Sequence, residues 1–182
     1  MDRRGLAVVL ALALVGVAVV AAVSIPSDGR SGPPSACANY SADYAVDRTG
    51  DYNRTTVDLR DADGTALASV DVRIADTPDK RRIGLSETAS LAAGEGMLFV
   101  HPGGGRHTYW MRGMAFPIDI VFATAAGEVT TIHHAATPAE LDGYGDFPGR
   151  GKFVFEVPRG YTNATGLDVG DCLAVPSGVS AG

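Results

Sequence analysis

Lysine is scarce in this sequence, and no run of basic residues occurs. Of its 15 basic residues only two are lysines, Lys80 and Lys152, and the 182-residue chain has a formal net charge of −6. A protein that contacts phosphates along a nucleic acid needs clustered basic side chains that displace counterions. The composition therefore predicts no nucleic-acid partner.

The sequence also lacks the motifs of several common catalytic and metal sites. It contains no Cys-x-x-Cys and no Gly-x-Ser-x-Gly, and Gly103-Gly104-Gly105 is without the Lys and Ser or Thr of a phosphate-binding loop. His133 and His134 are adjacent in an expected strand, so they point to opposite faces. We therefore predict no metal, no cofactor and no catalytic residue, and we favour a non-enzymatic protein.

Charge is absent from residues 5–25, which are almost all alanine, valine and leucine. As a helix this run would span about 31 Å, close to the hydrocarbon thickness of a bilayer. Arg3 and Arg4 should stay on the cytoplasmic side, which places the rest of the chain outside. We predict a single-pass anchor in the cell membrane. The alternative is a signal peptide cleaved near residue 24, which would secrete the protein.

Only two cysteines occur, Cys37 and Cys172, near the two ends of the exported part. Outside the cell they are expected to form one disulfide, with two free thiols as the alternative. Three Asn-x-Ser/Thr sequons begin at Asn39, Asn53 and Asn163. In an exported chain they are candidate glycosylation sites.

After the apolar run the chain divides by composition into a lead-in, a body and a tail. Residues 1–25 are the predicted anchor or signal segment. Residues 26–54 are expected to form a flexible linker and polar lead-in, because this stretch begins rich in Pro, Gly and Ser and continues with polar residues in no regular pattern. Residues 55–176 show strand alternation in short runs separated by turns, which predicts one β-rich domain. Residues 177–182 are expected to be a disordered tail.

Within the body, residues 56–60 and 67–75 predict a β-hairpin. Thr77-Pro78 is typical of a helix start, and the helix is expected over residues 79–85, ending near Gly84. Further strands are expected at residues 96–100, 107–111, 118–123, 128–134, 153–157 and 172–175, with a glycine turn at 103–105. The predicted fold class is α+β: a β-rich, mostly antiparallel, barrel-like sheet with one or two short helices, preceded by a single N-terminal transmembrane helix.

The charged residues are skewed in kind. The chain has 13 Arg against two Lys, and 16 Asp against five Glu. This bias, with abundant Gly and Ala, is typical of a halophilic protein, although a GC-rich genome would produce it too. At molar salt the Debye length is about 3 Å, so exposed ion pairs would contribute little to stability.

Several motifs occur in order through the middle of the chain. They are Arg82-Ile83-Gly84-Leu85, Gly96-Met97-Leu98-Phe99, Tyr109-Trp110-Met111-Arg112, Pro117-Ile118-Asp119-Ile120-Val121-Phe122, Gly127-Glu128-Val129, Phe155-Glu156-Val157-Pro158 and Val169-Gly170-Asp171. Over residues 65–176 the chain resembles the family called domain of unknown function 192. The resemblance implies a compact β-rich fold, often exported, with no established activity. With its charge bias, the chain looks like a salt-adapted archaeal member.

The chain departs from the family pattern after its tryptophan. The family usually has Trp-Met-Lys-Asn-Thr, whereas Arg112, Gly113 and Met114 stand in the last three places here. A ligand that depends on that Asn and Thr would therefore not be held in the same way.

Asp119 and Trp110 are the most informative single residues. Asp119 lies in an apolar strand and must face solvent, pair with a base or accept from backbone amides. A structural pair with Arg82 or Arg112 and a place in a pocket are both open. Trp110 and Arg112 should share one strand face, where they either bind a planar, anionic or sugar ligand or form part of the core.

Three functional hypotheses follow from these residues. The leading one is a membrane-tethered extracytoplasmic domain that binds a small ligand or an envelope partner through Arg82, Trp110, Arg112 and Asp119. The second is an envelope hydrolase or other enzyme whose site includes Asp119, Arg82 and His133, which would need to line one cleft. The third is a structural interaction module in which the same residues serve the core.

Overall fold

A computed structural model describes residues 36–40 and 42–182. The chain divides into two units, Met1–Gly32 and Pro33–Gly182, and every described residue belongs to the second. The anchor predicted at residues 5–25 lies outside the described residues. Among those that are described, no helix is long and apolar enough to cross a membrane.

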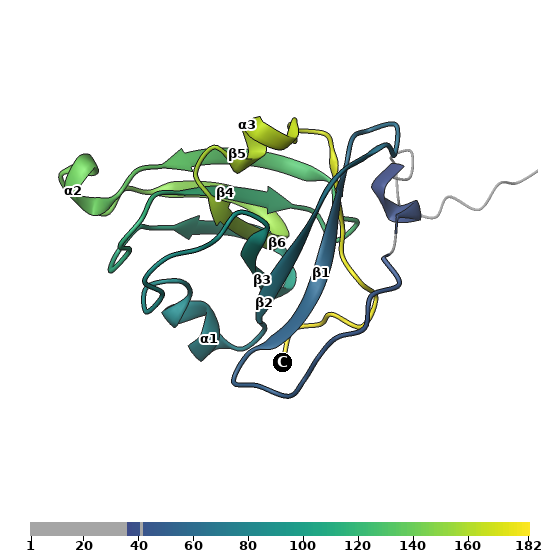
Figure 1. Cartoon of the computed structure of the whole chain (residues 1–182), viewed down its shortest axis with the longest axis horizontal. Coiled ribbons are helices and arrows are strands. Elements are labelled where there is room, and N and C mark those ends of the chain that lie inside the picture. The colour runs from purple at the N-terminus through teal and green to yellow at the C-terminus, as the bar shows by residue number, and fades with distance from the viewer. Residues whose placement is uncertain (1–35, 41) are drawn as a thin grey trace, which may run out of the picture. The chain divides into compact units, whose positions relative to one another are not determined.

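The described chain is built mainly from β-strands (Figure 1). Three short α-helices and one 3-10 helix connect them or flank them. In chain order the elements are η1 (Ala36–Asn39), β1 (Asn53–Arg60), β2 (Ala66–Ala75), α1 (Pro78–Ile83), β3 (Glu95–Tyr109), β4 (Ile118–Ala123), β5 (Val129–Ala135), α2 (Pro138–Leu141), β6 (Phe147–Pro158), α3 (Tyr161–Thr165) and β7 (Cys172–Ala174).

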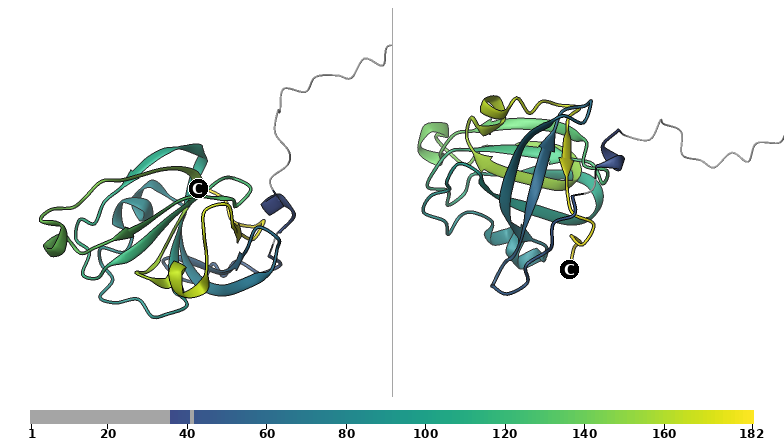
Figure 2. Two further views of the ribbon diagram at one scale, coloured as in Figure 1. Left: turned by 90° about the horizontal axis from the view of Figure 1, so that it is seen from above. Right: turned by 45° about the vertical axis from the view of Figure 1, so that its right-hand side comes forward.

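The strands form one seven-stranded sheet in the order β5-β4-β6-β3-β2-β1-β7. Every neighbouring pair is antiparallel except β2 and β3, which are parallel and are connected through α1. The sheet curls (Figure 2), and an isolated bridge between Glu128 and Cys172 joins β7 to the residue before β5. The predicted β-rich fold with few short helices is therefore confirmed, as a curled half-barrel.

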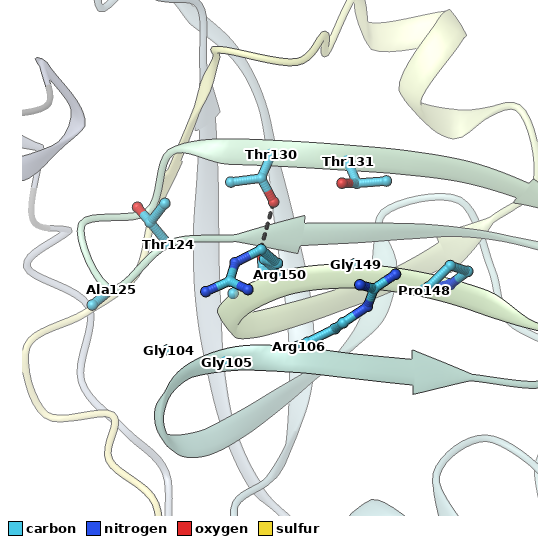
Figure 3. A pocket seen from close by; sticks show the side chains of 11 residues that line it. Gly104, Gly105, Arg106, Thr124, Ala125, Thr130, Thr131, Pro148, Gly149 and Arg150 are labelled. Carbon is cyan, nitrogen blue, oxygen red and sulfur yellow. Dashed lines mark hydrogen bonds between the residues drawn. The ribbon is translucent and has the colours of Figure 1, made fainter.

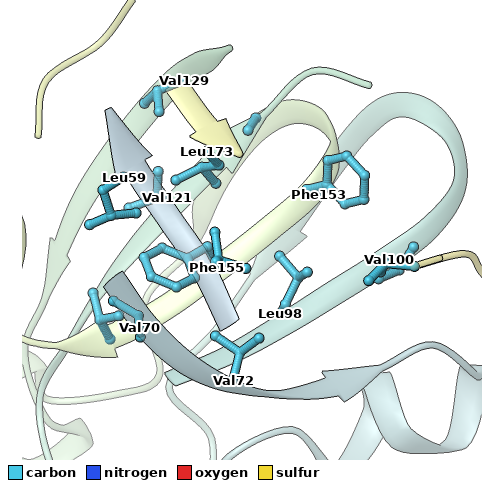
Figure 4. Close-up of a cluster of buried hydrophobic side chains, with 14 of the residues drawn as sticks. Leu59, Val70, Val72, Leu98, Val100, Val121, Val129, Phe153, Phe155 and Leu173 are labelled. Carbon is cyan, nitrogen blue, oxygen red and sulfur yellow. The ribbon is translucent and has the colours of Figure 1, made fainter. Parts of the chain in front are cut away.

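The core consists of two clusters, one on each face of the sheet. Strand β4 shows why both faces are apolar: Val121 and Ala123 contribute to one cluster, and Ile118, Ile120 and Phe122 contribute to the other. The alternation in the sequence predicts this division. Figure 4 shows the first cluster, which gathers side chains from all seven strands.

The first hairpin and the following helix agree with the sequence. Strands β1 and β2 pair antiparallel, with Val57 opposite Val70. Thr77 caps α1 by accepting a hydrogen bond from the Lys80 N–H, and Pro78 is the first helical residue. Gly84 ends the helix at a φ of 55°, where its missing side chain leaves room for the Phe99 ring.

Strand β3 differs from expectation because the glycine segment at 103–105 does not separate two strands. One strand runs through it, with Val100 opposite Phe153 and Gly105 opposite Gly151. Four residues of β3, 101–104, stand opposite the single residue Lys152 of β6, so β3 bulges there. Glycines tolerate this irregular backbone, which is why a turn composition occurs inside a strand.

From residue 36 on, the lead-in is tied to the body by a disulfide, and the tail packs on the body. Cys37 forms a disulfide with Cys172, as expected, with Cα atoms 5.3 Å apart. At the other end Val179 is buried, and the Gly182 N–H donates to the Asp76 carbonyl at 3.0 Å. Residues 177–182 therefore pack on the body instead of forming a disordered tail.

Candidate functional site

The candidate site is a pocket between helix α1 and strands β3 and β6. Its volume is about 430 Å³, within the usual range for small-molecule sites. Apolar walls come from residues of α1 and the turn after it and from β3. The lining residues are Pro78, Arg81, Arg82, Ile83, Gly84, Leu85, Ser86, Phe99, His101, His107, Thr108, Tyr109, Trp110, Arg112, Met114 and Glu156.

Glu156 provides the only carboxyl group among these lining residues. It lies near the C-terminal end of β6, opposite Met97 of β3 and Ile120 of β4, and is only 4% exposed. Within the described residues, no hydrogen bond or ion pair joins its carboxyl to another group. Burial raises the pKa of Glu156 to about 8, so the carboxyl is mostly protonated at neutral pH.

Tyr109 and His101 form a hydrogen-bonded pair beside this carboxyl. The Tyr109 hydroxyl lies 3.0 Å from His101 Nε2. Burial, followed by repulsion from His107 and Arg81, lowers the pKa of His101 to about 4, so its ring is neutral at pH 7. Burial and the nearby Glu156 raise the pKa of Tyr109. The inner part of the pocket therefore presents neutral polar groups on an apolar wall.

The bulge in β3 explains how two histidines from one strand enter the pocket together. The rings of His101 and His107 stack with centroids 3.6 Å apart. His107 Nε2 also lies 3.1 Å from the Gly151 carbonyl, which fixes the ring against β6. No group of three or more His, Cys, Asp or Glu side chains in the described part of the chain is arranged to hold a metal ion.

The rim of the pocket carries exposed aromatic and basic side chains. Trp110 is 58% exposed, so the structure places it on the surface and not in the core. The Arg112 guanidinium carbon lies 6.0 Å from the ring centroids of both Trp110 and Tyr144. Arg82 is also exposed and pairs with Asp79 at 3.4 Å. The pocket therefore brings together three predicted binding residues, Arg82, Trp110 and Arg112.

Asp119 does not belong to this pocket. Its side chain is fully buried on the opposite face of β4, where Oδ1 lies 2.6 Å from His134 Nδ1. Its Oδ2 accepts from both the backbone N–H and the hydroxyl of Thr162, at 3.0 and 2.8 Å. The expected pairing with Arg82 or Arg112 is therefore wrong, because α3 and β5 supply closer partners that the linear sequence does not reveal.

The residues of the enzyme hypothesis are likewise separated. His133 lies opposite Ile120 in the β4–β5 ladder, so it faces away from Asp119. His133 Nε2 instead lies 2.8 Å from the Pro148 carbonyl. Since Arg82 lies at the rim of the α1 pocket, the structure gathers no common cleft for the three.

The three sequons differ in their surroundings. Asn39 in η1 and Asn163 in α3 are exposed. The Asn53 side-chain amide donates to Asp76 Oδ2 at 2.9 Å and is partly buried. A glycan at Asn53 would have to break this hydrogen bond, whereas glycans at the other two would not.

A family model for DUF192, described as "Uncharacterized ACR", matches residues 59–175. The chain belongs to this family. The match confirms the resemblance found in the sequence and includes the whole α1 pocket of this DUF192 domain. No curated protein matches the chain.

Two solved structures are similar to this DUF192 domain. The crystal structure of a "putative transcription regulator" from Sinorhizobium meliloti 1021 has 27% sequence identity and a TM-score of 0.62, and the match covers 68% of this chain and 95% of that one. A protein of unknown function from Novosphingobium aromaticivorans DSM 12444 has 25% identity and a TM-score of 0.60, covering 78% and 98%.

Glu156 is the functional candidate that sequence reasoning missed. A signal was present, because Glu156 interrupts the apolar run Phe153-Val154-Phe155 and Val157 just as Asp119 interrupts its own strand. The pattern alone does not say which of two such carboxyls will find partners, since the partners come from distant elements.

Proposed function

We propose that this DUF192 domain binds a small hydroxylated ring, of the sugar class, in the α1 pocket. The observation that carries the proposal is Glu156: a buried carboxyl at the pocket wall without a hydrogen-bond partner among the described residues. No fully buried side-chain oxygen of the described residues lacks a partner, so the Glu156 carboxyl reaches the surface of the pocket, where a ligand hydroxyl can hydrogen-bond with it.

The inner groups of the pocket suit a neutral hydroxylated group, while Arg81, Arg82 and Arg112 give the rest of the lining a positive charge. Glu156 is mostly protonated and His101 is neutral at pH 7, so the inner groups offer both a donor and acceptors without net charge. Phe99 and Leu85 supply an apolar wall. Trp110 at the rim offers an exposed ring face on which the CH groups of a sugar ring can pack.

The binding proposal is tested on the full-length chain in mild detergent with a panel of monosaccharides and cell-envelope oligosaccharides. Trp110 is the single tryptophan, so its fluorescence reports on the rim directly. Calorimetry then gives the affinity of each responding sugar. We expect Glu156→Leu to weaken binding by about tenfold or more, because the ligand hydroxyl loses its partner.

Two further variants sharpen this test. Trp110→Ser should also weaken binding, since it removes the stacking surface, while Glu87→Gln, an exposed glutamate outside the pocket, should not. The proposal fails if no sugar in the panel changes the fluorescence. It fails equally if the affinity of a responding sugar is the same in the Glu156→Leu variant.

We further propose that residues 5–25 tether the domain to the membrane, with residues 37–182 outside. The length and apolar character of that run support an anchor, and the Cys37–Cys172 disulfide supports an oxidising compartment. Deleting residues 5–25 should release the protein from washed membranes into the soluble fraction. Recovery of the full-length chain in the cytosol with both cysteines reduced would contradict the proposal, and N-terminal sequencing separates an anchor from a cleaved signal.

A further inference from the structure

A second pocket lies outside the α1 pocket, between the bulged part of β3, strand β6 and the β4–β5 hairpin (Figure 3). Its volume is about 620 Å³. The lining is rich in glycine, threonine and arginine and contains no acidic residue. It consists of Gly104, Gly105, Arg106, Thr124, Ala125, Thr130, Thr131, Pro148, Gly149, Arg150 and Gly151.

Two arginines occupy directly opposite positions in this pocket. Arg106 of β3 and Arg150 of β6 are cross-strand partners, and both side chains lie in the pocket. Like charges at opposed positions of a ladder destabilise a sheet. Within the described residues neither guanidinium pairs with a carboxylate, so no acid in this part of the chain offsets the repulsion.

One of the threonines adds a hydrogen-bond donor. Thr124 Oγ1 accepts from the Ala126 and Glu128 backbone N–H groups, at 3.3 and 3.1 Å. In Figure 3 the Thr124 oxygen points away from the two arginines, so this hydroxyl is not placed to contact a group held by them. Thr131 lines the same pocket, and its side chain makes no hydrogen bond to a described residue. The Thr131 hydroxyl is therefore a hydrogen-bond donor open to a ligand in this pocket.

The glycines of this pocket reflect the packing of its strands, and both arginines are exposed. Gly104 has open space where a side chain would begin. At Gly149 a Cβ atom would lie 2.3 Å from the Phe122 ring, so the close packing of β6 on the core requires glycine there. The side-chain positions of Gly149 and Gly151 point away from Arg150, whose neighbours on its own face of β6 are Pro148 and Lys152.

We propose that this second pocket binds a phosphate group, held by the guanidinium groups of Arg106 and Arg150. Arginine matches phosphate with paired, charge-assisted hydrogen bonds, and two arginines suit a doubly charged group. The phosphate group could belong to a free ion or soluble monoester, or to a lipid headgroup.

The test is a titration of the full-length chain in mild detergent with inorganic phosphate, followed by NMR. The amide signals of Gly104, Gly105 and Gly149 report on this pocket alone. We expect them to shift saturably, and we expect Arg106→Gln and Arg150→Gln each to weaken binding by about tenfold. Arg159→Gln, which removes an exposed arginine outside the pocket, should bind as the unchanged protein does.

Dihexanoyl phosphatidic acid distinguishes the two sources of phosphate. Equal affinity for this short-chain lipid and for inorganic phosphate would support a free ion or monoester, and affinity at least tenfold higher for the lipid would support a headgroup. The proposal is overturned if these glycine signals do not shift, or if the two pocket variants bind phosphate as tightly as Arg159→Gln. Because Glu156→Leu leaves this pocket intact, its result bears only on the sugar site.

Discussion

Asp119 and Glu156 are acidic residues in adjacent strands of one sheet, both almost fully buried, and their surroundings differ in one respect. Asp119 has three hydrogen-bonding contacts, two from Thr162 and one with His134. Glu156, on the opposite face, has none among the described residues. The hydrogen-bonded carboxyl of Asp119 joins α3 to the sheet, whereas the carboxyl of Glu156, beside a cavity and without such bonds, indicates a place for a ligand.

The largest expected effect comes from removing the satisfied carboxyl. Asp119→Ala leaves the Thr162 N–H and hydroxyl and His134 without their acceptor, and we expect the free energy of unfolding to fall by about 3–5 kcal/mol. Urea denaturation measures this loss. Asp43→Ala, at an exposed aspartate, is the control and should change stability by less than about 0.5 kcal/mol. Equal stability of the two variants would remove the distinction drawn here.

Glu156 should make the free energy of unfolding depend on pH. Its pKa is about 8 in the folded protein against an ordinary value of 4.5, so the folded state binds more protons between these values and stability falls as pH rises. His101, with its lowered pKa, gives the opposite slope below pH 6.5. Between pH 6.5 and 8 we therefore expect the unchanged protein to lose about 2 kcal/mol and Glu156→Gln to lose much less. Parallel urea-stability profiles for the two proteins would contradict the assignment.

A smaller effect is expected at Thr162, which supplies two of the three contacts to Asp119. Thr162→Val keeps the shape and the backbone N–H but removes the hydroxyl donor. The free energy of unfolding should fall by about 1–2 kcal/mol. Thr131→Val, at a threonine without a hydrogen bond to a described residue, is the matched control in thermal unfolding. A loss as large for Thr131→Val would show that the hydroxyl contact to Asp119 is not what matters.

The smallest expected effect on stability is at the rim of the α1 pocket. Trp110 is 58% exposed, so Trp110→Ser should change the free energy of unfolding by less than about 0.5 kcal/mol while weakening sugar binding. Calorimetry of folding and of binding on the same sample separates the two quantities. A large loss of stability would mean that Trp110 supports the core and does not serve the pocket.

Local patterns in the sequence were enough to predict much of the fold. The cap at Thr77, the alternation in β4 and the pairing of Cys37 with Cys172 each depend on few residues or on a simple count, and all three are present. The strand through the 103–105 glycines was missed, because the pairing of β3 with β6 overrides the local preference for a turn.

The candidate site was predictable only in part. Arg82, Trp110 and Arg112 could be selected because they lie in recognisable motifs, and they do line one pocket. The partners of Asp119 come from 15 and 43 residues away, a distance at which spacing carries no information. Glu156 was overlooked because a missing partner is a property of the three-dimensional surroundings and leaves no trace in the sequence.

The Cys37–Cys172 disulfide also determines how the domain would respond to mechanical force. It encloses 134 residues in a covalent loop, since the two cysteines are 135 positions apart. Tension applied through the residues before Cys37 enters directly at β7, next to the bridge at which the two ends of the sheet meet. The loop containing both pockets is thereby shielded from stretching, and a pull on the two ends of the chain would extend only the segments outside it.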